Sequence, residues 1–311
     1  MIFKNQLCIY FINGSFGDAL YCIHDITSDN GNFNILISSK RIAKKALSMF
    51  TRNFSFNLPI GGNYFRKLIF IIFKLLPLID YILKVNVCIY NHKSFVIKKY
   101  CYENKKVKLF EISYIKNSIN LFPKKKKRIT FYGDYILINL DVDKSVRRIT
   151  DINSVRPTKL PTTFFFENLI IELKTKYPNY KFIQIGECGN QINNIDINLI
   201  NKTTLRELVD LIINAKYTIT IEGGIRALCI LVNSPALAIL GPSDQKLLPS
   251  SSFVRDVKYT SCSPCWRNTK NWYFQCNKNN NGEAICTSDI TLFPQIQNLT
   301  FIIQNEIYKY I

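Results

Sequence analysis

The chain has 311 residues, 47% of them hydrophobic and 20% charged, so it can bury a core and is too mixed in composition to be disordered. Its net charge of +19 is uneven: residues 1–133 carry 22 basic and 6 acidic side chains, and residues 134–311 carry 19 and 16. The net charges are therefore +16 and +3, which argues against a uniformly basic nucleic-acid-binding protein. We expect two domains, of which the first meets an anionic partner.

The N-terminal residues lack the pattern of a secretory signal, which predicts a cytoplasmic protein. The most apolar segment, 68–83, contains Lys74, Pro77 and Asp80 and falls short of a bilayer-spanning helix. We expect a helix that is buried on one face. The alternative is an interfacial helix, because basic side chains flank the segment.

The first half begins with an apolar strand, 7–12, followed by Asn13-Gly-Ser-Phe-Gly-Asp18 and a helix from Ala19. A strand, a glycine turn and a helix are typical of the first unit of an open α/β sheet, in which ligands bind at the carboxyl ends of the strands. Further strands are predicted at 34–38 and 85–90. The basic run 123–128 is expected to be an exposed linker, with phosphate binding as the alternative. The domain boundary is predicted to follow it, between residues 133 and 134.

The second half alternates strands and helices more clearly, which predicts a parallel, doubly wound sheet. Two such domains would face one another across a cleft. In the helix predicted at 203–215, Leu205, Leu208, Leu211 and Ile212 share one face. The expected strands are 135–140, 181–185, 217–221 and 236–240, and the expected helices are 162–176, 203–215, one that ends near residue 232, and 299–311.

Two stretches of the second half, NKTTLRELVDLIINAKYTITIEGG (201–224) and NSPALAILGPSD (233–244), resemble the C-terminal signature of the heptosyltransferases, glycosyltransferase family 9. In that family a Lys-Thr-Ser-Leu-x-Glu-Leu helix leads to a strand, an Asp-Thr/Ser-Gly turn, a helix, a proline and a strand ending in Gly-Pro-Thr-Asp. The stretch GSFGDAL (14–20) is similar to the family's Gly-x-x-Gly-Asp-x-Leu loop. The matches cover both halves and follow the family order.

The resemblance implies an α/β fold of the GT-B type, with two Rossmann-like domains facing a central cleft. Residues 1–133 would bind the acceptor and residues 134–311 the nucleotide sugar. The implied reaction is inverting transfer of a sugar, ADP-heptose being the expected donor, to a lipopolysaccharide-type acceptor. An acceptor hydroxyl must lose its proton as it attacks, and Asp18 stands where the family has its general base. The residues alone favour a different role for Asp18, as the N-cap of the following helix.

The departing nucleoside diphosphate needs cations or main-chain amides around it. Lys159 stands where the family has a catalytic lysine before a Trp-Pro turn, although Leu160 replaces the tryptophan; an ordinary solvated lysine is the alternative. Arg226 could be a surface arginine and Glu187 an exposed loop acid. The residues expected to bind the nucleotide sugar are Gly14, Gly17, Arg156, Glu187, Glu222, Gly223, Gly224, Arg226, Gly241 and Ser243.

Three positions depart from the family pattern. Glu222 replaces the usual Asp, Gly223 replaces Thr or Ser, and Ala227 stands where a His is common. Because the hydroxyl and the imidazole that the family has at these positions are missing, an alternative is that the protein is a degenerate member of the family without activity.

Four cysteines, Cys262, Cys265, Cys276 and Cys286, form a finger (262–286) with spacings of two, ten and nine residues. Four thiolates in a protein of a reducing compartment predict one tetrahedral site for zinc or iron. We expect this site to be structural, because four protein ligands leave no coordination position open for substrate. Disulfides and free thiols are the alternatives. The finger is similar to that of the bacterial autotransporter heptosyltransferases, which carry iron. No catalytic metal is expected.

The sequence leaves two alternatives for the acceptor. It is either an anionic glycolipid or a Ser or Thr hydroxyl of a protein, as in the autotransporter enzymes. The basic first half also suits peripheral contact with the anionic inner leaflet of the membrane. A non-catalytic protein that binds nucleic acid is the alternative from another class. We expect no nucleic-acid partner, because the basic residues form no recognisable nucleic-acid module.

Overall fold

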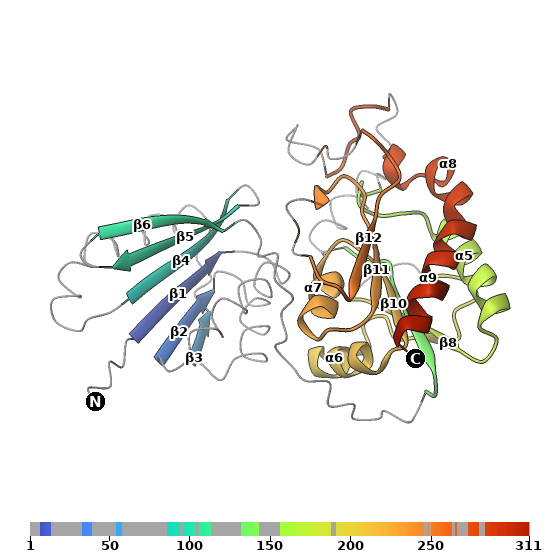
Figure 1. Cartoon of the computed structure of the whole chain (residues 1–311), viewed down its shortest axis with the longest axis horizontal. Helices are drawn as coiled ribbons and strands as arrows, with labels where there is room; N and C mark the ends of the chain where they lie inside the picture. Colours follow the sequence, from blue (N-terminus) through green and yellow to red (C-terminus); the bar gives the residue numbers. More distant parts are fainter. Residues whose placement is uncertain are drawn as a thin grey trace. The chain divides into compact units, whose positions relative to one another are not determined.

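The chain forms two compact units, Met1–Lys116 and Asn117–Ile311, in the computed structural model drawn in Figure 1. The structure describes the backbone of six strands in the first unit, and in the second unit residues 132–142, 156–187, 191–245, 248, 250–262, 265, 273–279 and 284–310. The helix expected from Ala19, the apolar segment 68–83 and the basic run 123–128 lie outside the described residues. The boundary predicted between residues 133 and 134 stays a prediction.

The sheet of the first unit has the strand order β3-β2-β1-β4-β5-β6. Its first four strands pair in parallel, and the last two add antiparallel strands at one edge. The strands are β1 (Leu7–Asn13), β2 (Phe33–Ser38), β3 (Phe54–Asn57), β4 (Asn86–Lys93), β5 (Val96–Glu103) and β6 (Lys106–Ile112). The sequence analysis did not predict these two antiparallel strands. The connections 94–95 and 104–105 are too short for the crossover that a parallel pair requires.

The sheet of the second unit has the order β12-β11-β10-β7-β8-β9, and every neighbouring pair is parallel. Its strands are β7 (Tyr135–Asn139), β8 (Lys181–Ile185), β9 (Ile197–Asn198), β10 (Tyr217–Ile221), β11 (Ala236–Ile239) and β12 (Val254–Val257). The predicted parallel, doubly wound sheet is confirmed here. Because the chain winds in opposite directions from β7, the carboxyl ends of β7 and β10 flank the point where such sheets bind ligands.

Helices cover both faces of this second sheet (Figure 1). The helices α5 (Thr163–Lys176) and α9 (Ile296–Tyr310) lie together on one face, and α6 (Leu205–Asn214) and α7 (Gly224–Leu231) lie on the other. Along β10, Tyr217, Ile219 and Ile221 join the core beneath α5 and α9. The buried Thr218 and Thr220 alternate with them and point to the opposite face, as the period of two in a strand requires.

Side-chain caps fix where α5 and α6 begin. The hydroxyl of Thr162 accepts a hydrogen bond from the backbone N–H of Phe165, and Thr204 forms a capping box with Glu207. The amphipathic helix predicted here is confirmed as α6, although the four apolar residues expected on one face are not equally buried. Leu211 and Ile212 are buried as expected, but Val209 is buried as well, and Leu205 and Leu208 are only partly covered.

The C-terminal helix α9 belongs to the core of the second unit. Its residues Leu299, Ile303 and Ile307 are at most 1% exposed and pack in the same cluster as Phe165, Phe166, Leu169, Ile170 and Leu173 of α5. Among the described residues, no helix has the length and apolarity needed to cross a bilayer.

We expect Ile303→Ala to lower the free energy of unfolding by about 2–5 kcal/mol, because it leaves a cavity where α9 meets the core. Phe301 lies on the same helix but is 62% exposed, so Phe301→Ala should change the free energy of unfolding by no more than about 0.5 kcal/mol. Urea unfolding of the two variants measures the difference. Equal losses would show that α9 does not contribute to the core in solution.

Candidate functional site

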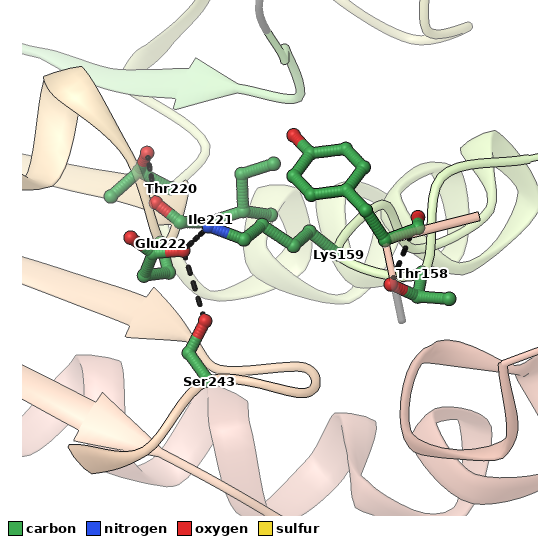
Figure 2. Close-up of polar contacts among 7 residues, drawn as sticks. Thr158, Lys159, Thr220, Ile221, Glu222 and Ser243 are labelled. Carbon is green, nitrogen blue, oxygen red and sulfur yellow. Dashed lines mark hydrogen bonds and ion pairs between the residues drawn. The ribbon is translucent and has the colours of Figure 1, made fainter. Parts of the chain in front are cut away.

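Three side chains from separate segments converge at the carboxyl edge of the second sheet (Figure 2). Glu222 directly follows β10, Ser243 lies in the turn after β11, and Lys159 lies in the loop that precedes α5. Because β10 flanks the switch point of the sheet, the cluster lies where a doubly wound sheet offers its ligand site.

Lys159 Nζ forms an ion pair with Glu222 Oε2, and Ser243 Oγ donates a hydrogen bond of 3.0 Å to the same oxygen. The side chains of Lys159 and Glu222 are only 11% and 10% exposed, and Ser243 is fully buried. Little water screens this pair, so the attraction between its charges is stronger than at the surface. An ordinary solvated lysine, the alternative considered from the sequence, is excluded by this burial.

The surroundings keep Glu222 ionised. Burial acts to raise the pKa of its carboxyl, but the charge and hydrogen bond of Lys159, the Ser243 hydroxyl and the charge of Arg226 outweigh it and lower that pKa. A carboxyl whose pKa falls on folding contributes stability above its ordinary pKa of 4.5 and loses it as the pH falls through the lowered value. At neutral pH the carboxyl of Glu222 is therefore negatively charged.

The loop around Lys159 is held by hydrogen bonds to residues distant in the sequence. Arg156 Nη1 donates to the carbonyl oxygens of Leu160 (3.0 Å) and Thr287 (3.1 Å). The structure thus gives Arg156 a bracing role, and its expected contact with the nucleotide stays a prediction. Gly241, after β11, lies so close that an added Cβ would be 3.0 Å from the Thr158 oxygen and from Thr287 Cγ2. A side chain at this position would therefore crowd the Lys159 loop and Thr287.

Helix α7 begins beside Glu222. Gly223 is its N-cap residue and Gly224 its first residue, and no side chain of a described residue caps it. The first backbone N–H groups of a helix have no partner within the helix and favour an anion. This helix start is the described feature that best suits the diphosphate expected from the sequence.

Arg226 lies deeper than the sequence suggested. It is 0% exposed, and its Nε and Nη2 donate to the two carboxylate oxygens of Asp256 at 2.7 and 2.6 Å. The alternative of a surface arginine is therefore wrong. This fork ties α7 to β12 beneath the site, and a direct contact between Arg226 and a phosphate stays a prediction.

Glu187 is exposed just beyond the carboxyl end of β8. Its backbone N–H donates to Asp141 Oδ2 at 2.6 Å, and Asp141 itself follows β7. Both acids thus lie at the ligand edge of the sheet. The sequence analysis missed Asp141, although it stands two residues after a strand just as Glu187 does. Binding of ribose hydroxyls by Glu187 stays a prediction.

Gly14, Gly17 and Asp18 lie outside the described residues. The structure places only the strand that precedes them, since β1 ends at Asn13, directly before Gly14. The strand order of the first sheet reverses at β1, so its carboxyl end flanks a switch point as well. The assignment of these three residues stays a prediction.

All four cysteines of the predicted finger are described. Cys276 and Cys286 are buried, and Cys262 and Cys265 are partly exposed. Burial, and to a smaller extent the neighbouring Cys265, Cys262 and Cys276, raise the pKa of the Cys286 thiol to about 12. Four interacting thiols are the ligand chemistry that zinc and iron prefer. Among the described residues, however, no three ligand side chains are arranged to hold a metal ion, so the predicted metal is not established.

The sequence analysis also missed Thr158, Tyr273 and Thr287, which surround the loop of Lys159. Thr158 donates to the carbonyl oxygen of Tyr273 and accepts from the Thr287 hydroxyl at its own carbonyl oxygen. The only sequence signal was proximity: Thr158 precedes the candidate lysine, and Tyr273 and Thr287 lie within or directly after the cysteine finger.

The sequence matches no protein-family model and no curated protein. Solved structures do match it over nearly its whole length. Escherichia coli ADP-heptose lipopolysaccharide heptosyltransferase II has 14% identity and a TM-score of 0.55, covering 97% of this chain and 99% of its own. A glycosyl transferase of family 9 from Veillonella parvula has 10% identity and a TM-score of 0.56, with coverage of 97% and 99%.

A third match is the dodecameric, iron-containing heptosyltransferase TibC of enterotoxigenic E. coli, whose structure holds ADP-D-β-D-heptose. Its identity is 12% and its TM-score 0.56, with coverage of 98% of this chain and 77% of its own. The chain therefore has the fold of the family 9 glycosyltransferases. This agrees with the fold that the resemblance implied.

We expect Asp256→Ala to lower the free energy of unfolding by about 3–5 kcal/mol, because it leaves the buried guanidinium of Arg226 without its carboxylate. The double variant Arg226→Met, Asp256→Leu removes both charges, so its free energy of unfolding should fall far less than that of Asp256→Ala. Chemical denaturation compares the variants. Equal losses in the single and double variants would mean that packing, and not the unpaired charge, accounts for the effect.

Proposed function

We propose that this protein is an inverting glycosyltransferase that uses a nucleotide sugar, with ADP-heptose as the donor. The observation that carries the proposal is the buried Lys159–Glu222–Ser243 cluster at the switch point of the second sheet, beside the start of α7. The shared fold and the ADP-heptose bound to TibC support the choice of donor.

The donor diphosphate binds Lys159 and the first backbone amides of α7. A lysine ammonium carries three N–H donors, so it can bind Glu222 and a phosphate oxygen together. As the bond to the sugar breaks, negative charge grows on the leaving diphosphate, and a cation fixed in advance stabilises it. Glu222, held ionised, accepts hydrogen bonds from hydroxyl groups of the sugar.

Transfer proceeds by direct displacement. Asp18 takes the proton of the acceptor hydroxyl as its oxygen attacks the anomeric carbon. The bond from that carbon to the phosphate oxygen breaks, and the nucleoside diphosphate leaves with the electron pair. One displacement inverts the anomeric configuration, and the step needs no metal.

The acceptor is a lipopolysaccharide-type glycan. The net charge of +16 on residues 1–133 supports an acceptor that carries phosphates or acidic sugars, and contact with an anionic membrane surface. Transfer to a protein hydroxyl is the second candidate, supported by the finger and by the likeness to iron-containing TibC. Transfer to an anionic glycolipid should weaken steeply with salt, and transfer to a protein should not.

The four thiols of the finger hold one structural zinc or iron. In the metal-free protein the raised pKa of Cys286 keeps its thiol protonated at neutral pH, so loading must release protons and becomes weaker as the pH falls. The metal supplies a cross-link between Cys262, Cys265, Cys276 and Cys286 and takes no part in transfer.

The proposed reaction predicts that ADP-heptose raises the melting temperature in a panel of nucleotide sugars, because a ligand present at 100 times its Kd adds about 2.7 kcal/mol of stability. Asp18→Asn should keep this shift and lower turnover by about 10²–10⁴-fold, as loss of a general base does. Lys159→Met should lose the shift itself.

Asp29→Asn is the matched control, an acid of the same half with no assigned role, and should keep both binding and turnover. If no nucleotide sugar in the panel raises the melting temperature, the proposed donor site is refuted. If Asp18→Asn keeps full turnover, the proposed base is refuted.

Metal analysis of the purified protein should find about one zinc or iron per chain. Cys276→Ser should lose it, because four ligands are needed to close a tetrahedral site. Cys229→Ser alters a buried cysteine of α7 outside the finger and should keep it. A metal-free protein whose finger thiols all react with a thiol reagent would contradict the metal site.

A further inference from the structure

Tyr273 lies within the cysteine finger, between Cys265 and Cys276, yet it contacts the loop of the donor site. Its carbonyl oxygen accepts two hydrogen bonds from Thr158, one from the backbone N–H at 2.9 Å and one from the hydroxyl at 3.1 Å. Two bonds from one residue to one oxygen fix the backbone of the residue that precedes Lys159.

The ring of Tyr273 also contacts Lys159 itself. Lys159 Nζ lies 5.6 Å from the centre of the ring, within the range of a cation–π interaction. The lysine side chain is 11% exposed, so this attraction acts where little water competes. The same ammonium group is thus attracted by the carboxylate of Glu222 and by the ring of Tyr273.

The end of the finger holds the same loop. Thr287 directly follows Cys286, and its hydroxyl donates to the carbonyl oxygen of Thr158 at 2.9 Å. Its own carbonyl oxygen accepts from Arg156 Nη1. The loop of Lys159 is therefore bonded to the chain both before Cys276 and after Cys286.

We propose that Tyr273 is a positioning residue that holds the Lys159 ammonium in place for the donor diphosphate. This inference rests on the proposed role of Lys159. The ring restricts the flexible lysine side chain before the donor arrives, so less conformational entropy is lost on binding. Tyr273 acts through Lys159 and makes no contact with the donor itself.

A double-mutant cycle with ADP as the probe tests this role, with affinity measured by calorimetry. Tyr273→Leu should weaken ADP binding about tenfold, because it removes the ring and keeps the backbone bonds to Thr158. Tyr273→Phe keeps the ring and should stay within about twofold of the unchanged protein. In a Lys159→Met background, Tyr273→Leu should have almost no further effect.

The cycle separates positioning from direct contact with the nucleotide. If Tyr273→Leu weakens binding equally in both backgrounds, the ring acts on the nucleotide or on the fold in general, and the proposal is wrong. If Tyr273→Phe weakens binding as much as Tyr273→Leu, the hydroxyl and not the ring is responsible, and the proposal is again wrong.

Urea unfolding of the same variants gives a readout that needs no nucleotide. The shifts of the unfolding midpoint caused by Tyr273→Leu and Lys159→Met should be non-additive, whereas Phe301→Leu, on the exposed face of α9, should add to Lys159→Met. If no variant binds ADP, the proposed function fails while this cycle still decides whether ring and lysine interact. Additive shifts for Tyr273 and Lys159 would overturn the inference.

Discussion

The ion pair between Lys159 and Glu222 is the interaction on which the rest of the site depends. It joins a loop before α5 to the end of β10, segments 63 residues apart, and both side chains are about nine-tenths covered. A buried charge is costly without a partner, so the fold has to bring the two segments together and keep them there. Three further contacts hold these segments together: the hydrogen bond from the Ser243 hydroxyl, the close approach at Gly241 and the hydrogen bonds to Thr158.

A second buried ion pair, between Arg226 and Asp256, has a different role. Arg226 and Asp256 are joined by two hydrogen bonds, which tie α7 to β12. The Arg226–Asp256 pair holds α7 against the sheet, whereas the Lys159–Glu222 pair lies at the carboxyl edge of the sheet. The charge of Arg226 still reaches the site, since it helps to lower the pKa of Glu222. A residue can thus influence a ligand site without touching the ligand.

The sequence predicted the second half well because local pattern and tertiary environment agree there. The strands 181–185 and 217–221 have the observed bounds, and the helix predicted at 162–176 begins one residue later, after its Thr162 cap. In the first half, the strands β3, β5 and β6 were not predicted. Strands β5 and β6 mix charged and apolar residues and pair antiparallel, and antiparallel strands need no continuous apolar run. Their pairing depends on very short connections and not on hydrophobic periodicity.

For the candidate site, the sequence by itself determined which side chains are available at the strand ends, because a strand followed by a turn and a helix exposes the same end of every parallel strand. It thereby singled out Glu222 and Ser243, whereas Lys159 was singled out by the resemblance to the heptosyltransferases. Only the tertiary structure decided their partners: that Lys159 pairs with Glu222, that Arg226 is buried against Asp256, and that Tyr273 and Thr287 of the finger region hold the lysine loop. Such contacts join residues up to 131 positions apart, and no local pattern encodes a distance that only the packing of the whole unit creates.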